Sequence, residues 1–285
     1  MKKVVLFLFA AAMAFASCGT SRTVPIIGRT QHLMVDDQQV LSLSNQQYQE
    51  YMKSAKPSTN KVNTAMVRRC GQRLATAVET YLRNNGLSSE LSEYKWEFNL
   101  VQDQEVNAFC MPGGKIVVYE GLLPVTKDES SLAIVLGHEI AHAVAKHSAE
   151  RMSNSVREQY GVGILGAVAS GVGLGSEAQQ LGAAALGTGL QAMNSGFSRK
   201  QESEADHLGL IFAAMAGYDP QVAAPFWQRM AAQGSSSNSI FSDHPSDETR
   251  VKNIQGWIPE AEKYYKTSSK SASSSPQTVR TIHIK

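Results

Sequence analysis

Two histidines four residues apart constrain the fold of this chain more than any other feature of its sequence. His138 and His142 enclose Glu139 in the sequence H-E-I-A-H, and Asp128 is placed to cap a helix over about 129–156. Residues i and i+4 of a helix lie one turn apart on one face, so both imidazoles can reach a single ion. Glu139 lies roughly a quarter turn from His138 and can hold a water molecule as a general base. The motif therefore predicts one zinc ion per chain.

A catalytic zinc site needs a third protein ligand and an open position. The candidate ligand is Glu202, and Asp206 lies one turn further along the same helix face. Small residues continue this face and also flank the two histidines, so two helices can approach closely. Asp206 is expected to accept a hydrogen bond from the other ring nitrogen of a ligand histidine. Glu204 points almost the opposite way, and His147 and His207 lie off the ligand faces, where we expect them to be exposed.

The periodicity of the remaining chain predicts a mainly helical α+β domain with a small antiparallel sheet. We expect this domain to span 36–262, after a tether at 18–35 and before a Ser-rich, disordered tail at 263–285. The Gly- and Ala-rich stretch 161–196 is either a mobile lid over the site or a plain hairpin of the core. Helices are expected at 36–55, 59–86, 129–156, 197–216, 221–233 and 246–258, one strand at 94–100, and a hairpin at 107–119.

The first 17 residues are typical of a lipoprotein signal peptide. Lys2 and Lys3 precede an apolar stretch that is too short to span a membrane. Small residues before Cys18 resemble a bacterial lipobox, which implies cleavage there and a diacylglyceryl group on the thiol. The alternative is an ordinary secretory peptide cleaved within the same small residues. We therefore expect a chain that faces the periplasm, anchored by its lipid to a cell-envelope membrane, with the outer membrane favoured.

The net charge of the chain narrows its class of partner, and its cysteines leave two possible redox states. The net charge is +2, and loss of Lys2 and Lys3 with the signal peptide balances 25 basic against 25 acidic residues. A balanced charge gives no electrostatic case for nucleic acid as a partner. Cys70 and Cys110 remain in the exported chain. They either form a disulfide, as an oxidising compartment allows, or stay as two buried free thiols.

Four motifs in order resemble the gluzincin family of CAAX prenyl endopeptidases and HtpX-type proteases, over roughly residues 34–258. The similarity is greatest to the soluble periplasmic lipoprotein branch, which includes the LoiP and BepA types. Along the chain, the motifs are N-A-F at 107–109, H-E-x-x-H at 138–142, S-R-x-x-E-x-x-A-D at 198–206, and His-Pro at 244–245 followed by Arg250.

The resemblance implies a zincin-type metalloprotease domain in which zinc lies on the two motif histidines and Glu202. It implies that Glu139 activates water for endoproteolysis. It also implies that His244 is catalytic, either at the open metal position or beside the oxyanion, and that Arg250 holds the loop of His244. The simpler alternatives are a loop histidine before a proline and an exposed helix arginine.

Polypeptides are the expected substrates. We expect an extended peptide to pair with the edge of the strand at 115–119 and to contact Asn107, Ala108, Lys115 and Val117. Main-chain pairing favours unfolded chains, so the sequence predicts a quality-control protease of the cell envelope. The alternatives are an envelope assembly or binding factor with little or latent proteolytic activity, and a prenyl-protein endopeptidase.

Overall fold

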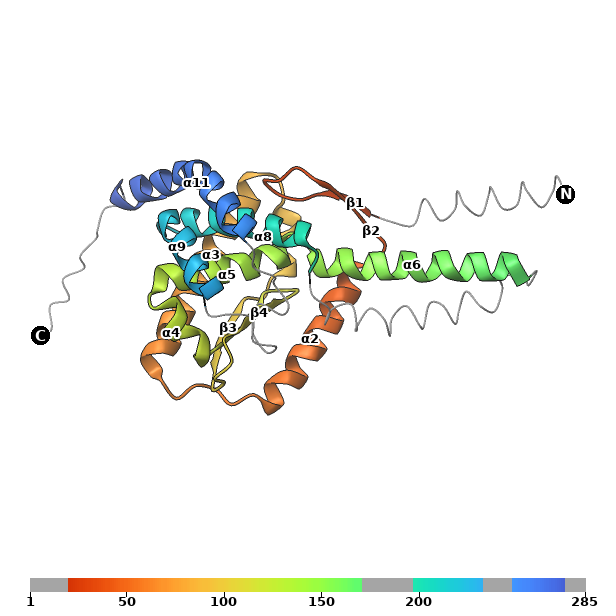
Figure 1. The fold of residues 1–285 in the computed structure, drawn as a ribbon, viewed down its shortest axis with the longest axis horizontal. Coiled ribbons are helices and arrows are strands. Elements are labelled where there is room, and N and C mark those ends of the chain that lie inside the picture. The colour runs from red at the N-terminus through yellow and green to blue at the C-terminus, as the bar shows by residue number, and fades with distance from the viewer. Residues whose placement is uncertain (1–19, 171–196, 233–247, 275–285) are drawn as a thin grey trace, which may run out of the picture.

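The computed structural model describes residues 20–170, 197–232 and 248–274, and these form a mainly helical domain with two small sheets (Figure 1). The expected α+β class is confirmed. The helices are α2 (Asp37–Ser54), α3 (Lys61–Asn84), α4 (Leu123–Thr126), α5 (Glu129–Val144), α6 (His147–Ser170), α8 (Arg199–Met215), α9 (Ala223–Ala232) and α11 (Glu248–Ser274). The strands are β1 (Thr20–Thr23), β2 (Thr30–Leu33), β3 (Glu97–Val101), β4 (Ala108–Met111) and β5 (Lys115–Tyr119). Short 3-10 helices, η1 (Ser88–Glu93), η2 (Glu120–Leu122) and η3 (Pro220–Val222), link them.

Side-chain caps fix where the two central helices begin. Asp128 accepts a hydrogen bond of 2.7 Å from the backbone N–H of Ser131, which starts α5 where the sequence predicts. Ser198 and Gln201 form a capping box at the start of α8. Because these caps satisfy backbone N–H groups that have no partner inside the helix, both helices have defined ends and a defined rotation.

Helix α5 lies at the centre of the domain. All of its residues from Ser131 to Val144 are buried, and α3, α8, α9 and β4 pack around it. Large apolar side chains from several elements enclose it, among them Leu74, Phe212, Phe226 and Trp227. None of the helices in the described ranges combines the length and the hydropathy that a membrane span requires.

The three-stranded sheet is mixed rather than antiparallel. Its order is β3-β5-β4, with β3 parallel and β4 antiparallel to β5. The predicted hairpin of β4 and β5 is confirmed, but the expectation that 115–119 offers a free edge is wrong, because β5 is bonded on both sides. Lys115 and Val117 are buried at 7 % and 0 % exposure. The outer strand beside α5 is β4.

The segment at 20–33 is folded, so its interpretation as a tether is wrong. β1 and β2 pair as an antiparallel hairpin, and Val24 between them is fully buried in the main core. Arg22 donates to the carbonyl of Val144 and Gln31 donates to the carbonyl of Ala145, at 3.1 and 2.8 Å. The hairpin therefore binds the C-terminal end of α5, where cations and donors are favoured.

The helix expected over 129–156 is two helices. α5 ends at Val144, and α6 begins at His147. Lys146 between them adopts a positive φ of 52°, which stops the hydrogen-bond ladder and turns the chain. In Figure 1, α6 then extends away from the body of the domain. The break changes the direction of every side chain after Lys146.

Three expected segments, the C-terminal tail, the stretch 161–196 and the loop of His244, lie partly or wholly at the limits of the described residues. α11 continues to Ser274, so the first part of the segment predicted as a disordered tail is helical. Most of the stretch 161–196 and the whole loop that contains His244 lie outside the described residues.

Cys70 and Cys110 are both free, so the disulfide alternative is wrong. Burial raises the pKa of the Cys70 thiol to about 12.

Candidate metal centre

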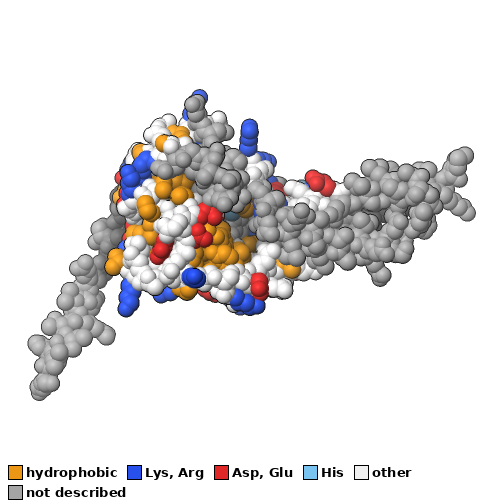
Figure 2. Space-filling model, turned by 60° about the horizontal axis from the view of Figure 1, so that its bottom comes forward, with side chains coloured by type: hydrophobic (Ala, Val, Ile, Leu, Met, Phe, Trp, Pro, Cys, Tyr) orange, Lys and Arg blue, Asp and Glu red, His pale blue; other side chains and the backbone are white. Residues whose placement is uncertain are grey.

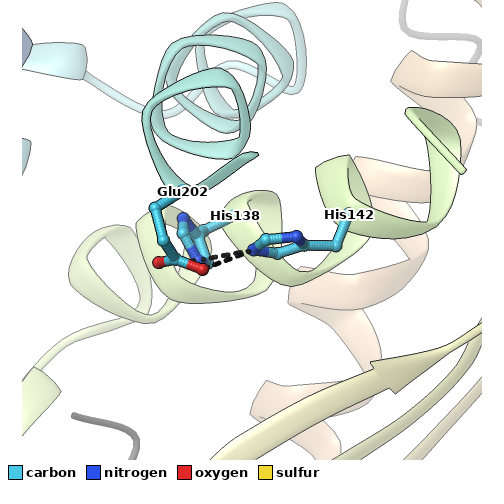
Figure 3. A group of neighbouring side chains, drawn as sticks. All are labelled: His138, His142 and Glu202. Atoms are coloured by element: carbon cyan, nitrogen blue, oxygen red, sulfur yellow. Dashed lines mark hydrogen bonds and ion pairs between the residues drawn. The ribbon is translucent and has the colours of Figure 1, made fainter. Parts of the chain in front are cut away.

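Three side chains from two helices meet at one point inside the domain. His138 and His142 project from α5, and Glu202 projects toward them from the first turn of α8 (Figure 3). The two Nε2 atoms lie 3.1 Å apart. The carboxylate oxygens of Glu202 lie 3.5 Å from Nε2 of His138 and 3.4 Å from Nε2 of His142. All three residues are at most 5 % exposed.

The two distances to the Glu202 carboxylate match the spacing that a tetrahedral metal ion requires, and the distance between the two Nε2 atoms is slightly shorter. Ligand atoms placed 2.0–2.2 Å from such an ion lie about 3.3–3.6 Å from one another. Each of the three residues offers one ligand atom, and the three atoms lie within 4.8 Å of one another. Two imidazoles and one carboxylate are a donor set that zinc accepts with a position left for water. The residues present therefore fit zinc.

A close helix contact brings Glu202 to the histidines. The contact is made by Gly137 on α5 and Gly209 on α8. A Cβ atom on Gly209 would lie 2.5 Å from the backbone nitrogen of His138, and one on Gly137 would lie 2.6 Å from the carbonyl oxygen of Gly209. The expected close approach is present, and it depends on backbone packed against backbone at the site itself.

Asp206 and Arg250 orient His138. Oδ1 of Asp206 lies 2.8 Å from Nδ1 of His138 and accepts a hydrogen bond of 2.6 Å from Arg250. The guanidinium of Arg250 also lies over the ring of Trp227, with Cζ 3.4 Å from the ring centroid. Because the carboxylate can only accept here, the proton of His138 lies on Nδ1, and Nε2 presents its lone pair toward the cluster.

Arg250 is only 5 % exposed, so the alternative of an exposed helix arginine is wrong. Its described partners are Asp206 and the metal-site residues. The loop that the family resemblance assigns to it lies outside the described residues.

His147 and Glu204 orient His142, and sequence reasoning missed both. His147 is fully buried rather than exposed, since the positive φ at Lys146 turns its ring back toward α5. Its Nδ1 lies 2.9 Å from Nδ1 of His142, and its Nε2 lies 3.2 Å from Oε2 of Glu204. Burial lowers the pKa of both histidines, which keeps the two rings neutral near pH 7.

Charged partners hold Glu204 in place. Arg29 from the N-terminal hairpin donates to both oxygens of Glu204, at 2.6 and 2.8 Å, and also bonds Glu150 on α6. Burial alone would raise the pKa of Glu204, but the bonds from His147 and Arg29 outweigh it and lower that pKa. The same balance lowers the pKa of Glu150 to about 2, with Arg29 and Gln201 as its main donors.

Glu139 lies between the two histidines on α5 and is 2 % exposed. Burial raises the pKa of the Cys110 thiol on β4 well above its ordinary value, and the charge of Glu139 is the second cause of this rise. Since α5 packs against β4, the helix that carries this candidate general base lies beside the outer strand of the sheet. On the face shown in Figure 2, hydrophobic side chains gather with acidic side chains directly beside them.

The other expected site residues lie around this centre. Ala108 is the first residue of β4, and Asn107 directly before it donates from Nδ2 to Glu105 at 2.9 Å. His207 is partly buried rather than exposed, stacked on Trp257 and paired with Glu260. His244 is outside the described residues. A signal for His147 exists in its spacing, five residues after the second motif histidine, but that signal requires the helix break to be known.

Comparison with known proteins agrees with this geometry. Residues 68–258, about two thirds of the chain, match Peptidase family M48. The chain is 40 % identical over 183 residues to the mitochondrial metalloendopeptidase OMA1 of Schizosaccharomyces pombe, which covers 63 % of this chain and 52 % of that protein. It is 30 % identical over 244 residues to human OMA1, covering 83 % and 46 %.

A bacterial relative shows the same likeness. The β-barrel assembly-enhancing protease of Escherichia coli is 32 % identical over 164 residues, covering 55 % of this chain and 33 % of that protein. The chain thus spans about half the length of the curated relatives it matches, or less. The matched region contains the H-E-x-x-H helix, Glu202 and Arg250, and on these grounds the chain belongs to peptidase family M48.

Proposed function

We propose that this chain is a zinc-dependent endopeptidase that hydrolyses unfolded or misassembled polypeptides in the cell envelope. The observation that carries the proposal is the convergence of three ligand atoms at tetrahedral spacing beside a buried glutamate. Family membership and the relatives, which are named as metalloendopeptidases, support the reaction class.

In this proposal, His138, His142 and Glu202 hold the zinc. When bound, zinc lowers the pKa of a water molecule and polarises the scissile carbonyl. Glu139 takes the proton of the attacking water and delivers it to the leaving amine. His244 is proposed to act beside the oxyanion or at the open position, as the family resemblance implies.

The substrate is proposed to lie along β4. As an outer strand, β4 has a main-chain edge that β5 does not occupy, and β4 packs against α5, the helix that carries Glu139. An extended polypeptide that adds to this edge would pass its scissile bond close to Glu139. Ala108 at the start of β4 and Asn107 just before it remain proposed contacts, whereas Lys115 and Val117 would act only through the packing of the neighbouring strand β5.

The cellular setting is proposed from the N-terminus and from one relative. Cys18 is proposed to carry a diacylglyceryl anchor after removal of 1–17. The name of the Escherichia coli relative refers to β-barrel assembly, which supports a substrate among envelope proteins. We therefore place the domain on the periplasmic side of a membrane, with the outer membrane favoured.

The test is a Glu139→Gln variant assayed with unfolded casein, together with the zinc content of the same sample. Loss of a general base is expected to lower the turnover number by roughly 10²–10⁴-fold, while zinc stays bound because Glu139 is not a ligand. The control is Glu50→Gln on the exposed face of α2, which should cleave like wild type. Equal cleavage by Glu139→Gln and wild type would refute the proposal. Zinc without any cleavage in the wild type would favour the assembly factor instead.

A further inference from the structure

We propose that His147 is a positioning residue of the metal centre, which accepts the Nδ1–H of His142 and so directs the lone pair of His142 Nε2 at the metal. This inference rests on the proposed zinc function. His147 is fully buried at the start of α6, and its ring contacts the ring of His142 from the side away from His138 and Glu202.

The hydrogen-bond chain allows one assignment of protons. Two Nδ1 atoms 2.9 Å apart share one hydrogen, so one ring donates and the other accepts. Glu204 holds two bonds from the guanidinium of Arg29, so it is ionised and can only accept. The Nε2 of His147 faces this carboxylate at 3.2 Å and must carry the proton of that ring.

The position of the proton on His147 fixes the position of the proton on His142, and so determines which nitrogen of His142 faces the metal site with a lone pair. With its proton on Nε2, the neutral ring of His147 presents a lone pair at Nδ1, and His142 must donate from Nδ1. The Nε2 of His142 then carries the lone pair, and it is this atom that lies 3.1 Å from Nε2 of His138. A metal ligand histidine needs this tautomer, and the partner of its other nitrogen sets it.

The residue that anchors this hydrogen-bond network comes from a distant part of the sequence. Arg29 lies just before β2, and it fixes both Glu204 on α8 and Glu150 on α6. Gln201 adds a 2.9 Å bond to Glu150. The N-terminal hairpin thus belongs to the metal centre, although it lies outside the region that matches the family. His138 has a shorter support of the same kind, through Asp206 and Arg250.

The variants are chosen to separate hydrogen bonding from packing. His147→Leu removes both ring nitrogens, whereas His147→Asn keeps an acceptor oxygen close to the position of Nδ1. His207→Leu makes the same replacement at a histidine of α8 that bonds Glu260 and does not contact the cluster. The zinc dissociation constant is measured by competition with a chromogenic chelator, and the melting temperature of each metal-free variant reports on folding.

Wild type is expected to bind one zinc, and His147→Leu to bind it about 10–100-fold more weakly. His147→Asn should recover most of that loss, and His207→Leu should bind like wild type. Equal affinity of His147→Leu and wild type would overturn the inference, as would a loss in His147→Asn as large as in His147→Leu. Failure of the wild type to bind zinc would instead refute the proposed function.

A spectroscopic measurement decides the matter even if a variant does not fold. Nitrogen-15 NMR of the zinc-bound wild type should show a proton on Nδ1 of His142 and none on Nδ1 of His147. The reverse assignment would contradict the role proposed for His147.

Discussion

Replacing Gly209 by alanine tests the helix contact on which the metal site depends. A methyl group on Gly209 would lie 2.5 Å from the backbone nitrogen of His138 and 2.7 Å from the backbone carbon of Gly137. Both neighbours are backbone atoms of a helix, so no side chain can rotate away. Reaching an ordinary contact of 3.4 Å requires α5 and α8 to separate by about 0.9 Å at this point.

The cost follows from two opposing effects. Alanine in place of glycine favours a helix by about 1 kcal/mol. Overpacking a close contact costs about 1–3 kcal/mol, with rigid backbone neighbours favouring the upper end. We expect a net loss of about 2 kcal/mol in the free energy of unfolding. Glu202 lies on the same face of α8, two turns earlier, so the separation also draws its carboxylate away from both imidazoles.

The assay is urea unfolding of the metal-free protein together with the zinc dissociation constant. The matched control is Gly256→Ala on α11, where a Cβ would meet nothing within 4 Å. This control should gain about 0.5–1 kcal/mol in stability and leave zinc affinity unchanged. If Gly209→Ala gains stability as Gly256→Ala does and binds zinc as wild type does, the close contact does not place Glu202.

Three further predictions concern Asp206, Glu150 and the two cysteines. Asp206→Asn should weaken zinc binding by about 10–100-fold in the chelator competition, because a neutral amide is a poorer acceptor for Nδ1 of His138. Ionised Glu150 should contribute on the order of 2 kcal/mol at neutral pH, since its pKa is lowered from 4.5 to about 2. That contribution is complete above the unfolded-state pKa and is lost as the pH falls toward 2, so urea midpoints of Glu150→Gln and wild type should converge in acid; a constant gap would contradict this. Cys70 and Cys110 should both take up an alkylating reagent when the protein is denatured without reductant, and a mass shift of only zero or one group would contradict their free state.

The geometry around the motif was accessible from sequence because it depends on local periodicity. Spacings of four residues on α5 and α8 place His138 with His142, and Glu202 with Asp206, and small residues predict that the two helices approach. The strand at 115–119 also carries a signal of its central position, since Ile116, Val117 and Val118 form a continuous apolar run with no alternation. That run predicts a strand buried on both of its faces, as expected for an inner rather than an edge strand.

The parts that sequence reasoning missed depend on long-range contacts. The strands of the N-terminal hairpin have four residues each and few apolar side chains, and ion pairs with Glu90, Glu150 and Glu204 hold them. No local period reports such partners. The position of His147 depends on the backbone of a single residue, Lys146, whose positive φ nothing in its own identity predicts. A continuous helix would have placed that histidine elsewhere.

X-ray anomalous scattering at the zinc absorption edge would show whether His138, His142 and Glu202 hold one zinc ion. A crystal of the metallopeptidase domain should show a single peak about 2.0–2.2 Å from Nε2 of both histidines and from a carboxylate oxygen of Glu202. A map without a peak there, or with a metal that Glu202 does not contact, would contradict the account.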